Sequence, residues 1–141
     1  VKGRLPLKLM RAMDEFASML LTPQLKRHII IHVVFRKKMR YLGLTTVEDY
    51  NVVGKPREFI IEIKRNQSEV ETIKTLAHEM VHVRQFARGE LNEEGTLWQG
   101  RSITRDLDYH EQPWEIEAHD LTEILYEEYV DVIRQTDRDG R

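Results

Sequence analysis

Apolar residues recur at helical spacing in three segments of the chain, and they run together or alternate in two others. Residues 7–21, 68–88 and 113–135 show the first pattern and are predicted to form helices. The run Ile29–Phe35 is rich in β-branched residues and bounded by charges, which predicts a buried strand. Residues 57–65 alternate between apolar and charged side chains, which predicts a half-buried strand at an edge of a sheet.

Residues with known preferences for helix ends support the second and third helices. Ser68 and Glu71 have the spacing of a capping box, in which each side chain bonds the backbone at the other residue. Gly89 suits the end of the same helix, and Pro113 suits the first position of the last one.

The other segments carry weaker patterns. Residues 36–56 are predicted to form a loop or a poorly defined hairpin, residues 97–104 a short strand, and residues 136–141 a frayed tail. We therefore expect an α+β fold in the order α-β-β-α-β-α, with a short sheet packed on the helix of residues 68–88 and on the last helix.

The composition limits the kinds of functional site that the chain can form. A length of 141 residues suits a single domain spanning 1–141. The absence of cysteine excludes disulfides, iron–sulfur clusters, thiol catalysis and Cys-ligated zinc, so His, Asp or Glu must hold any metal. No segment resembles a signal peptide or a membrane span. We expect a cytoplasmic protein, in the host cytoplasm if the chain is viral, without a membrane partner.

Charge is distributed unevenly along the chain. Residues 1–40 carry ten Lys and Arg against two acidic residues, whereas residues 41–141 carry twelve Lys and Arg against twenty-two acidic residues. A basic segment can direct a protein to nucleic acid. We do not favour that partner, because aromatic residues that would stack on bases do not alternate with these cations.

The segment His78–His82 has the pattern HExxH. Residues four apart lie on one face of a helix, so the two imidazoles could bind one Zn²⁺. Glu79 could then act as the general base toward a water molecule activated by the metal. Both histidines lie on the side of the helix away from its apolar stripe, which argues against core packing.

A catalytic zinc site needs a third protein ligand and one open position. In the last predicted helix, Glu115 and His119 fall together at the border of the buried stripe, where a side chain could reach a site at the edge of the core. Glu117, Glu127 and Glu128 fall on the solvent side and are predicted to be solvated. Both Glu115 and His119 remain candidates on this geometry, and we favour Glu115.

His78 and His82, followed by Glu115-x-x-Ala118 on a later helix, resemble the ligand pattern of the gluzincin clan of zinc metallopeptidases. The resemblance extends from residue 57 to residue 129 and is strongest to small members, the minigluzincins and phage-encoded metallopeptidases. The string Pro113–Ala118 is also similar to SprT-like phage proteins. The resemblance to the gluzincins implies a small zincin-like domain.

The resemblance also implies roles for single residues. Glu115 would be the third ligand, Glu79 the base, and Tyr109, just before the last helix, a donor to the oxyanion. His119 departs from the gluzincin pattern, where Asp or Asn often orients a zinc-bound His; as a ligand it would give the three-His site of SprT-like proteins. Related peptidases bind substrate on an edge strand before the zinc helix, a place that residues 57–65 occupy in chain order.

The leading hypothesis is a zinc-dependent endopeptidase that acts on a protein or peptide substrate. The alternative is a non-catalytic regulatory or binding module that a metal stabilises, with possible nucleic-acid association through the basic N-terminal part. Glu79 weighs against the alternative, because a purely structural metal site needs no base.

Overall fold

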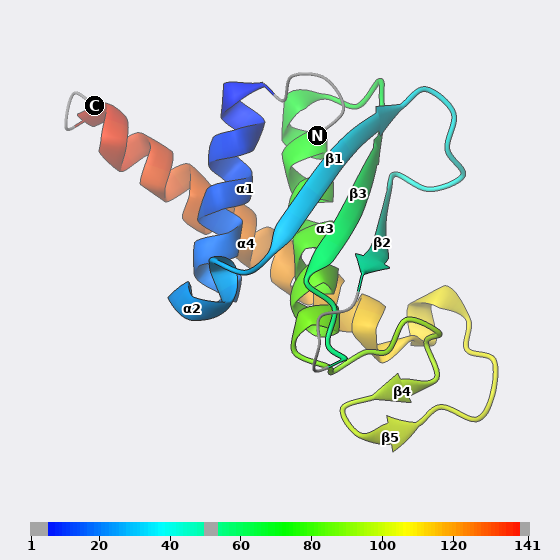
Figure 1. Ribbon diagram of the computed structural model, residues 1–141. Coiled ribbons are helices and arrows are strands. Elements are labelled where there is room, and N and C mark those ends of the chain that lie inside the picture. The colour runs from blue at the N-terminus through cyan, green and yellow to red at the C-terminus, as the bar shows by residue number, and fades with distance from the viewer. Residues whose placement is uncertain (1–5, 50–53, 139–141) are drawn as a thin grey trace.

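A mixed three-stranded sheet lies against the helix that carries the HExxH segment (Figure 1). The computed structural model describes residues 6–49 and 54–138. The strands are β1 (Ile30–Arg36), β2 (Gly43–Asp49) and β3 (Glu58–Lys64), in the spatial order β1-β3-β2. β1 is parallel to β3, whereas β2 is antiparallel to it, with Thr45 opposite Ile61. β3 is therefore the central strand, and β2 forms one edge.

One expectation for the sheet is wrong, and a second is incomplete. Residues 57–65 do not form an edge strand, because β3 pairs on both sides. Its charged positions face the open side of the sheet, where Glu58 accepts a hydrogen bond from His32 on β1. The segment 36–56, expected to form a loop or a poorly defined hairpin, contains the strand β2, which pairs antiparallel with β3. Its residues 50–53 lie outside the described residues.

Three of the four helices that the structure describes follow the predicted positions closely, and the short helix α2 (Pro23–Lys26) was not predicted. The other three are α1 (Leu7–Leu20), α3 (Glu69–Ala87) and α4 (Pro113–Arg138). Ser68 and Glu71 form the expected capping box at the start of α3. α4 continues to Arg138, so the prediction of a frayed tail is wrong for residues 136–138, and residues 139–141 lie outside the described residues.

A small hairpin and a short turn join α3 to α4. The hairpin pairs β4 (Leu97–Trp98) with β5 (Arg101–Ser102), where the sequence predicted one strand over residues 97–104. A 3-10 turn, η1 (Tyr109–Glu111), precedes α4. The α+β class is confirmed, but α2, β2 and the paired strands of the hairpin add to the expected order.

α3 lies at the centre of the molecule. It contacts α1 and α4 on one side and strands β2 and β3 on the other (Figure 1). The α3-facing side chains of β3 are fully buried, namely Phe59, Ile61 and Ile63. On the opposite side, the Phe16 and Tyr129 rings join α1 to α4, with centroids 5.7 Å apart. Polar residues of α3 are thus held in place by packing on several sides. Among the described residues, no helix has the length and apolar character needed to cross a membrane.

Candidate metal centre

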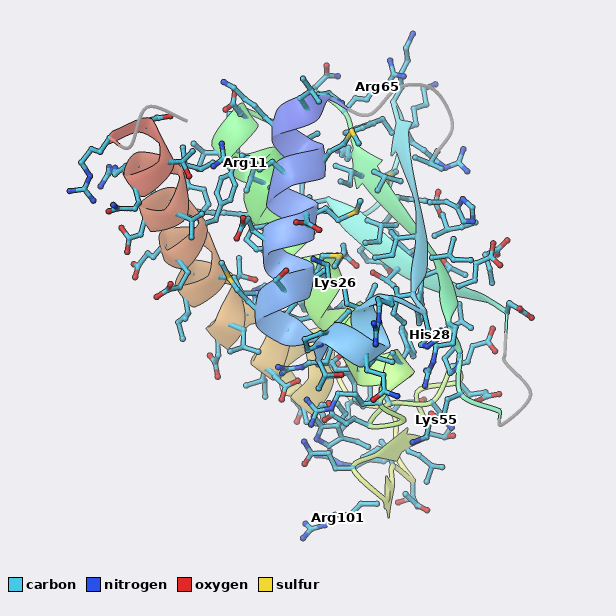
Figure 2. The ribbon with its side chains drawn as sticks, turned by 60° about the vertical axis from the view of Figure 1, so that its left-hand side comes forward. Arg11, Lys26, His28, Lys55, Arg65 and Arg101 are labelled. Carbon is cyan, nitrogen blue, oxygen red and sulfur yellow. The ribbon has the colours of Figure 1, made fainter. Side chains whose placement is uncertain are left out.

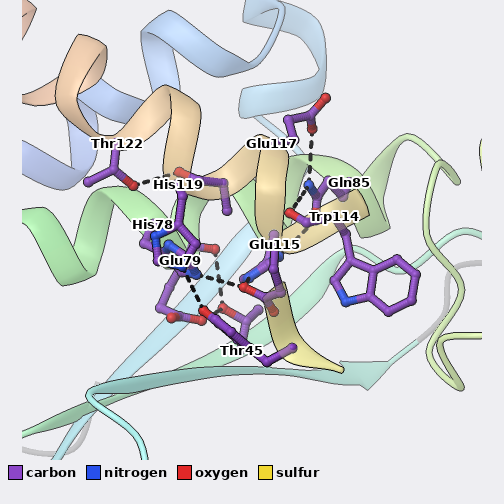
Figure 3. A network of polar contacts seen from close by, with 12 residues as sticks. Thr45, His78, Glu79, Gln85, Trp114, Glu115, Glu117, His119 and Thr122 are labelled. Atoms are coloured by element: carbon purple, nitrogen blue, oxygen red, sulfur yellow. Dashed lines mark hydrogen bonds and ion pairs between the residues drawn. The ribbon is translucent and has the colours of Figure 1, made fainter. Parts of the chain in front are cut away.

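His78 and His82 of α3 converge on Glu115, which projects from the first turn of α4 (Figure 3). Glu115 Oε1 lies 2.9 Å from His78 Nε2 and 3.1 Å from His82 Nε2. The three ligand atoms all lie within 4.8 Å of one another. The arrangement depends on two local features: the one-turn spacing of the histidines, and Pro113, which starts α4 just before Glu115.

This donor set fits a zinc ion. Two imidazole nitrogens and one carboxylate oxygen are ligands that catalytic zinc sites use, with a fourth position left for water or substrate. Tetrahedral ligands at zinc-bonding distance lie about 3.3 Å from one another. The two nitrogen–oxygen distances of 2.9 and 3.1 Å are close to that spacing, and all three ligand atoms lie within 4.8 Å of one another, so small side-chain adjustments would admit the ion.

The three ligand candidates also stabilise one another electrostatically. Burial raises the pKa of Glu115, but hydrogen bonds from His78 and His82 outweigh burial and hold that pKa well below its usual range. Burial likewise lowers the pKa of His82, but the hydrogen bond to Glu115 and the charge of Glu79 reverse the effect and raise it. Without a metal, His82 therefore favours the protonated form beside an ionised Glu115.

Glu79 lies beside the ligands, and its residue is only 5% exposed. Burial raises the pKa of its carboxyl group, and the positive charges of His82 and His78 partly offset that rise. A carboxylate whose pKa is moved toward neutrality is suited to general-base chemistry. The Thr45 hydroxyl of β2 donates to Glu79 Oε1 at 2.8 Å.

A fully buried glutamine links the two helices behind His82. The Gln85 amide nitrogen donates to the Trp114 carbonyl oxygen and to Glu117 Oε1, each at 3.0 Å (Figure 3). Arg84 also donates to Glu117, at 3.4 Å. The prediction that Glu117 is solvated is wrong, because long side chains of α3 reach across to its half-buried carboxylate.

Tyr109 and His119 pair with each other at the rim of the site. The Tyr109 hydroxyl lies 3.0 Å from His119 Nε2, and the His119 ring packs edge-on to His78 at 4.7 Å between centroids. Burial, together with the negative charge of Glu115, raises the pKa of Tyr109, so the hydroxyl keeps its proton. His119 is exposed and lies outside the group formed by the three ligand atoms.

A groove of about 900 Å³ contains the site and lies between β2 and α4. Leu44 and Thr45 line it from β2, and His119 and Thr122 line it from α4, with α3 between them. Arg40 and neighbouring residues before β2 also line it, as do apolar side chains that include Phe86, Leu91 and Trp114. The metal-ligand candidates and Glu79 thus share one open groove.

The basic residues of the N-terminal part are dispersed. Lys8 pairs with Glu69 at 3.3 Å, Lys26 pairs with Asp14 at 2.7 Å, and Arg36 pairs with Glu62. Figure 2 shows Arg11 and Lys26 at separate places on the molecule. That nucleic acid is not the favoured partner of this part of the chain stays a prediction.

Sequence reasoning named the four residues at the centre of the site: His78, Glu79, His82 and Glu115. It did not find Gly43, Thr45 and Gln85. Gly43 and Thr45 belong to β2, in the segment that was expected to form a loop or a poorly defined hairpin, and only the β-branched run Thr45–Val47 marked it as extended. Gln85 lies three residues after His82, a spacing that places both on one helix face.

No family model matches this sequence, and the searches of curated proteins and of solved structures likewise return no match.

Proposed function

We propose that this protein is a zinc-dependent endopeptidase with a zincin-like fold and a gluzincin-type ligand set of His78, His82 and Glu115. The observation that carries the proposal is the position of Glu79. A buried carboxylate lies beside a three-ligand group that leaves a coordination position free, on a groove that can admit an extended chain. A structural metal site would need neither the carboxylate nor the groove.

In this proposal, peptide hydrolysis depends on the bound zinc ion, Glu79 and Tyr109. Zinc bound by the three ligands would lower the pKa of a water molecule and polarise the scissile carbonyl. Glu79 accepts the proton of the attacking water and passes it to the leaving amine, which its raised pKa favours. Tyr109, which keeps its proton, donates a hydrogen bond to the oxygen that becomes negatively charged.

Strand β2, rather than the predicted residues 57–65, is the candidate partner for the substrate backbone. The Leu42 carbonyl accepts from the Lys64 backbone N–H at 2.9 Å, so Leu42 points its backbone groups toward β3. Because these groups alternate along an antiparallel strand, Gly43 and Thr45 direct theirs away from β3. An extended peptide could pair with them, which would fix the scissile bond beside Glu79.

The proposal is tested by comparing Glu79→Gln with Glu127→Gln, an exposed control on α4. We expect all three proteins to bind about one zinc ion per chain. Wild type and the control should cleave an unfolded protein such as casein, and Glu79→Gln should do so at least about 100-fold more slowly. Zinc binding without cleavage by wild type would support the non-catalytic alternative, and equal cleavage by Glu79→Gln would exclude Glu79 as the base.

A further inference from the structure

Two residues of β2 lie next to the Glu79 side chain, one beside each carboxylate oxygen. The Thr45 hydroxyl lies 2.8 Å from Oε1 (Figure 3), and the backbone at Gly43 passes so close to Oε2 that a Cβ atom there would lie 2.9 Å from it. We propose that Thr45 and Gly43 are positioning residues that hold the carboxylate of Glu79 in one orientation. The inference rests on the proposed function for its effect on catalysis, but the contacts themselves are independent of it.

Thr45 fixes one oxygen by hydrogen bonding. Its hydroxyl lies 2.8 Å from Glu79 Oε1 and 3.2 Å from the Glu79 main-chain oxygen. A hydroxyl has a single proton, and the ionised, nearer oxygen is the stronger acceptor. Donation to Oε1 stops the carboxylate from rotating and leaves Oε2 as the oxygen that exchanges a proton with the reacting water.

Gly43 permits the close approach of the strand. A Cβ atom at this position would lie 2.9 Å from Glu79 Oε2 and 2.7 Å from the Thr75 methyl carbon. Both distances are well below van der Waals contact, so any side chain would push the carboxylate or the strand away. The absence of a side chain therefore lets the edge strand pass directly beside the base.

The same two residues direct their backbone groups into the groove, as the pairing of Leu42 with Lys64 requires. Side chains alternate along a strand, so the side chain of Thr45 and the Cα hydrogen of Gly43 that replaces one lie on the same face of β2 as the buried Val47, toward α3. One strand would thus align the substrate and the base relative to each other. A small shift of β2 would disturb the geometry of proton transfer more than the binding of substrate.

The first test compares Thr45→Val, Thr45→Ser and Thr46→Val in the zinc-loaded protein. Thr45→Val keeps the shape but removes the donor, Thr45→Ser restores the donor, and Thr46→Val makes the same change on the opposite face of β2. We expect Thr45→Val to lower kcat about tenfold or more with little change in KM. Thr45→Ser and Thr46→Val should stay near wild type, and all three should bind zinc equally.

A second readout does not depend on activity. The carboxyl ¹³C resonance of Glu79, assigned by its loss in Glu79→Gln, should move in Thr45→Val and stay in place in Thr46→Val. An unmoved resonance in Thr45→Val overturns the proposal, whether or not the protein cleaves peptides. If Glu79→Gln is inactive while Thr45→Val has the kcat of wild type, the positioning role fails and the proposed function stands.

Gly43→Ala tests the other oxygen and is best made in a Thr75→Ser background. Serine removes the Thr75 methyl carbon and keeps the hydroxyl that bonds Gln67, so the remaining close contact of the new Cβ is with Glu79. We expect Gly43→Ala in this background to move the Glu79 resonance and lower kcat relative to Thr75→Ser alone. Equal spectra and equal kcat would show that β2 does not constrain Oε2.

Discussion

Gln85 Oε1 accepts a hydrogen bond from His82 Nδ1 at 2.7 Å, in a position with no exposure to solvent. The amide nitrogen of Gln85 already donates to Trp114 and Glu117, so the oxygen must face His82. The Nδ1 of His82 therefore carries a proton, and Nε2 is the nitrogen that can bind a metal. Gln85 thus sets the tautomer of one candidate ligand and ties it to the helix that carries another.

Replacing Gln85 with methionine should weaken zinc binding. The substitution keeps the volume but removes the acceptor for His82 and the donor for α4. We expect the zinc affinity to fall about 10–100-fold, as for other residues that orient metal-bound histidines. Competition with a chromophoric chelator measures this, with Gln24→Met on the exposed surface of α2 as control. An affinity equal to that of wild type would contradict the role given to Gln85.

The choice between Glu115 and His119 as third ligand can be made by metal content. Glu115→Ala should lose stoichiometric zinc, because it removes the carboxylate that lies near both histidines. His119→Ala should keep about one zinc ion per chain, because its Nε2 is directed to Tyr109 instead. Elemental analysis after dialysis against a weak chelator distinguishes them. The reverse result would point to a three-histidine site.

Tyr109→Phe should slow cleavage without releasing the metal. Loss of a hydrogen-bond donor to a developing oxyanion typically lowers kcat about 100-fold, with a smaller effect on KM. His119→Ala should cause a milder loss, because the tyrosine hydroxyl loses its partner but remains present. Steady-state kinetics with Tyr126→Phe as control measures both effects. Unchanged kcat in Tyr109→Phe would remove Tyr109 from the mechanism.

Stability should depend on pH differently with and without zinc. The pKa of His82 is raised above its ordinary 6.5 and that of Glu79 above 4.5, so both stabilise the metal-free fold at low pH and lose that contribution as pH rises. Glu115, with a lowered pKa, contributes above 4.5 and loses its contribution only in strong acid. We therefore expect the melting temperature of the chelator-treated protein to fall as the pH rises above the ordinary His82 pKa of 6.5.

Zinc should reverse that trend, because metal binding requires His82 Nε2 to lose its proton. The increase in melting temperature caused by zinc should be larger at pH 8 than at pH 6. Differential scanning fluorimetry at both values, with and without zinc, measures the difference. An equal zinc effect at both values would mean that no ligand proton is released in this range.

The three long helices and two of the three sheet strands could be predicted because each carries a helical repeat, an apolar run or an alternation of its own, and Ser68 and Pro113 mark the starts of α3 and α4. β2 could not, because its outward side chains are exposed and its inward row begins with Gly43, which contributes no apolar signal. β3 was expected at an edge because it alternates. A central strand can also alternate when one face of the sheet is open, and here Glu58 and Glu62 pair with His32 and Arg36 of β1.

The candidate ligands could be predicted for a related reason. His78 and His82 are placed by one helix alone, and Glu115 follows from the angle of its own helix relative to the buried stripe. Glu117 shows where that reasoning stops. A helical wheel gives the direction of a side chain but not which side chains of a neighbouring helix contact it. Here Arg84 and Gln85 of α3 donate hydrogen bonds to Glu117.

The alternation of β2, combined with the absence of cysteine in the chain, makes the strand a convenient place for a spectroscopic probe. Leu44 is 43% exposed and lines the groove, yet its side chain points to the face opposite Gly43 and Thr45. A cysteine at this position would be the single thiol of the protein and could carry a fluorophore. Its emission would report a peptide entering the groove in real time, before any bond is cut.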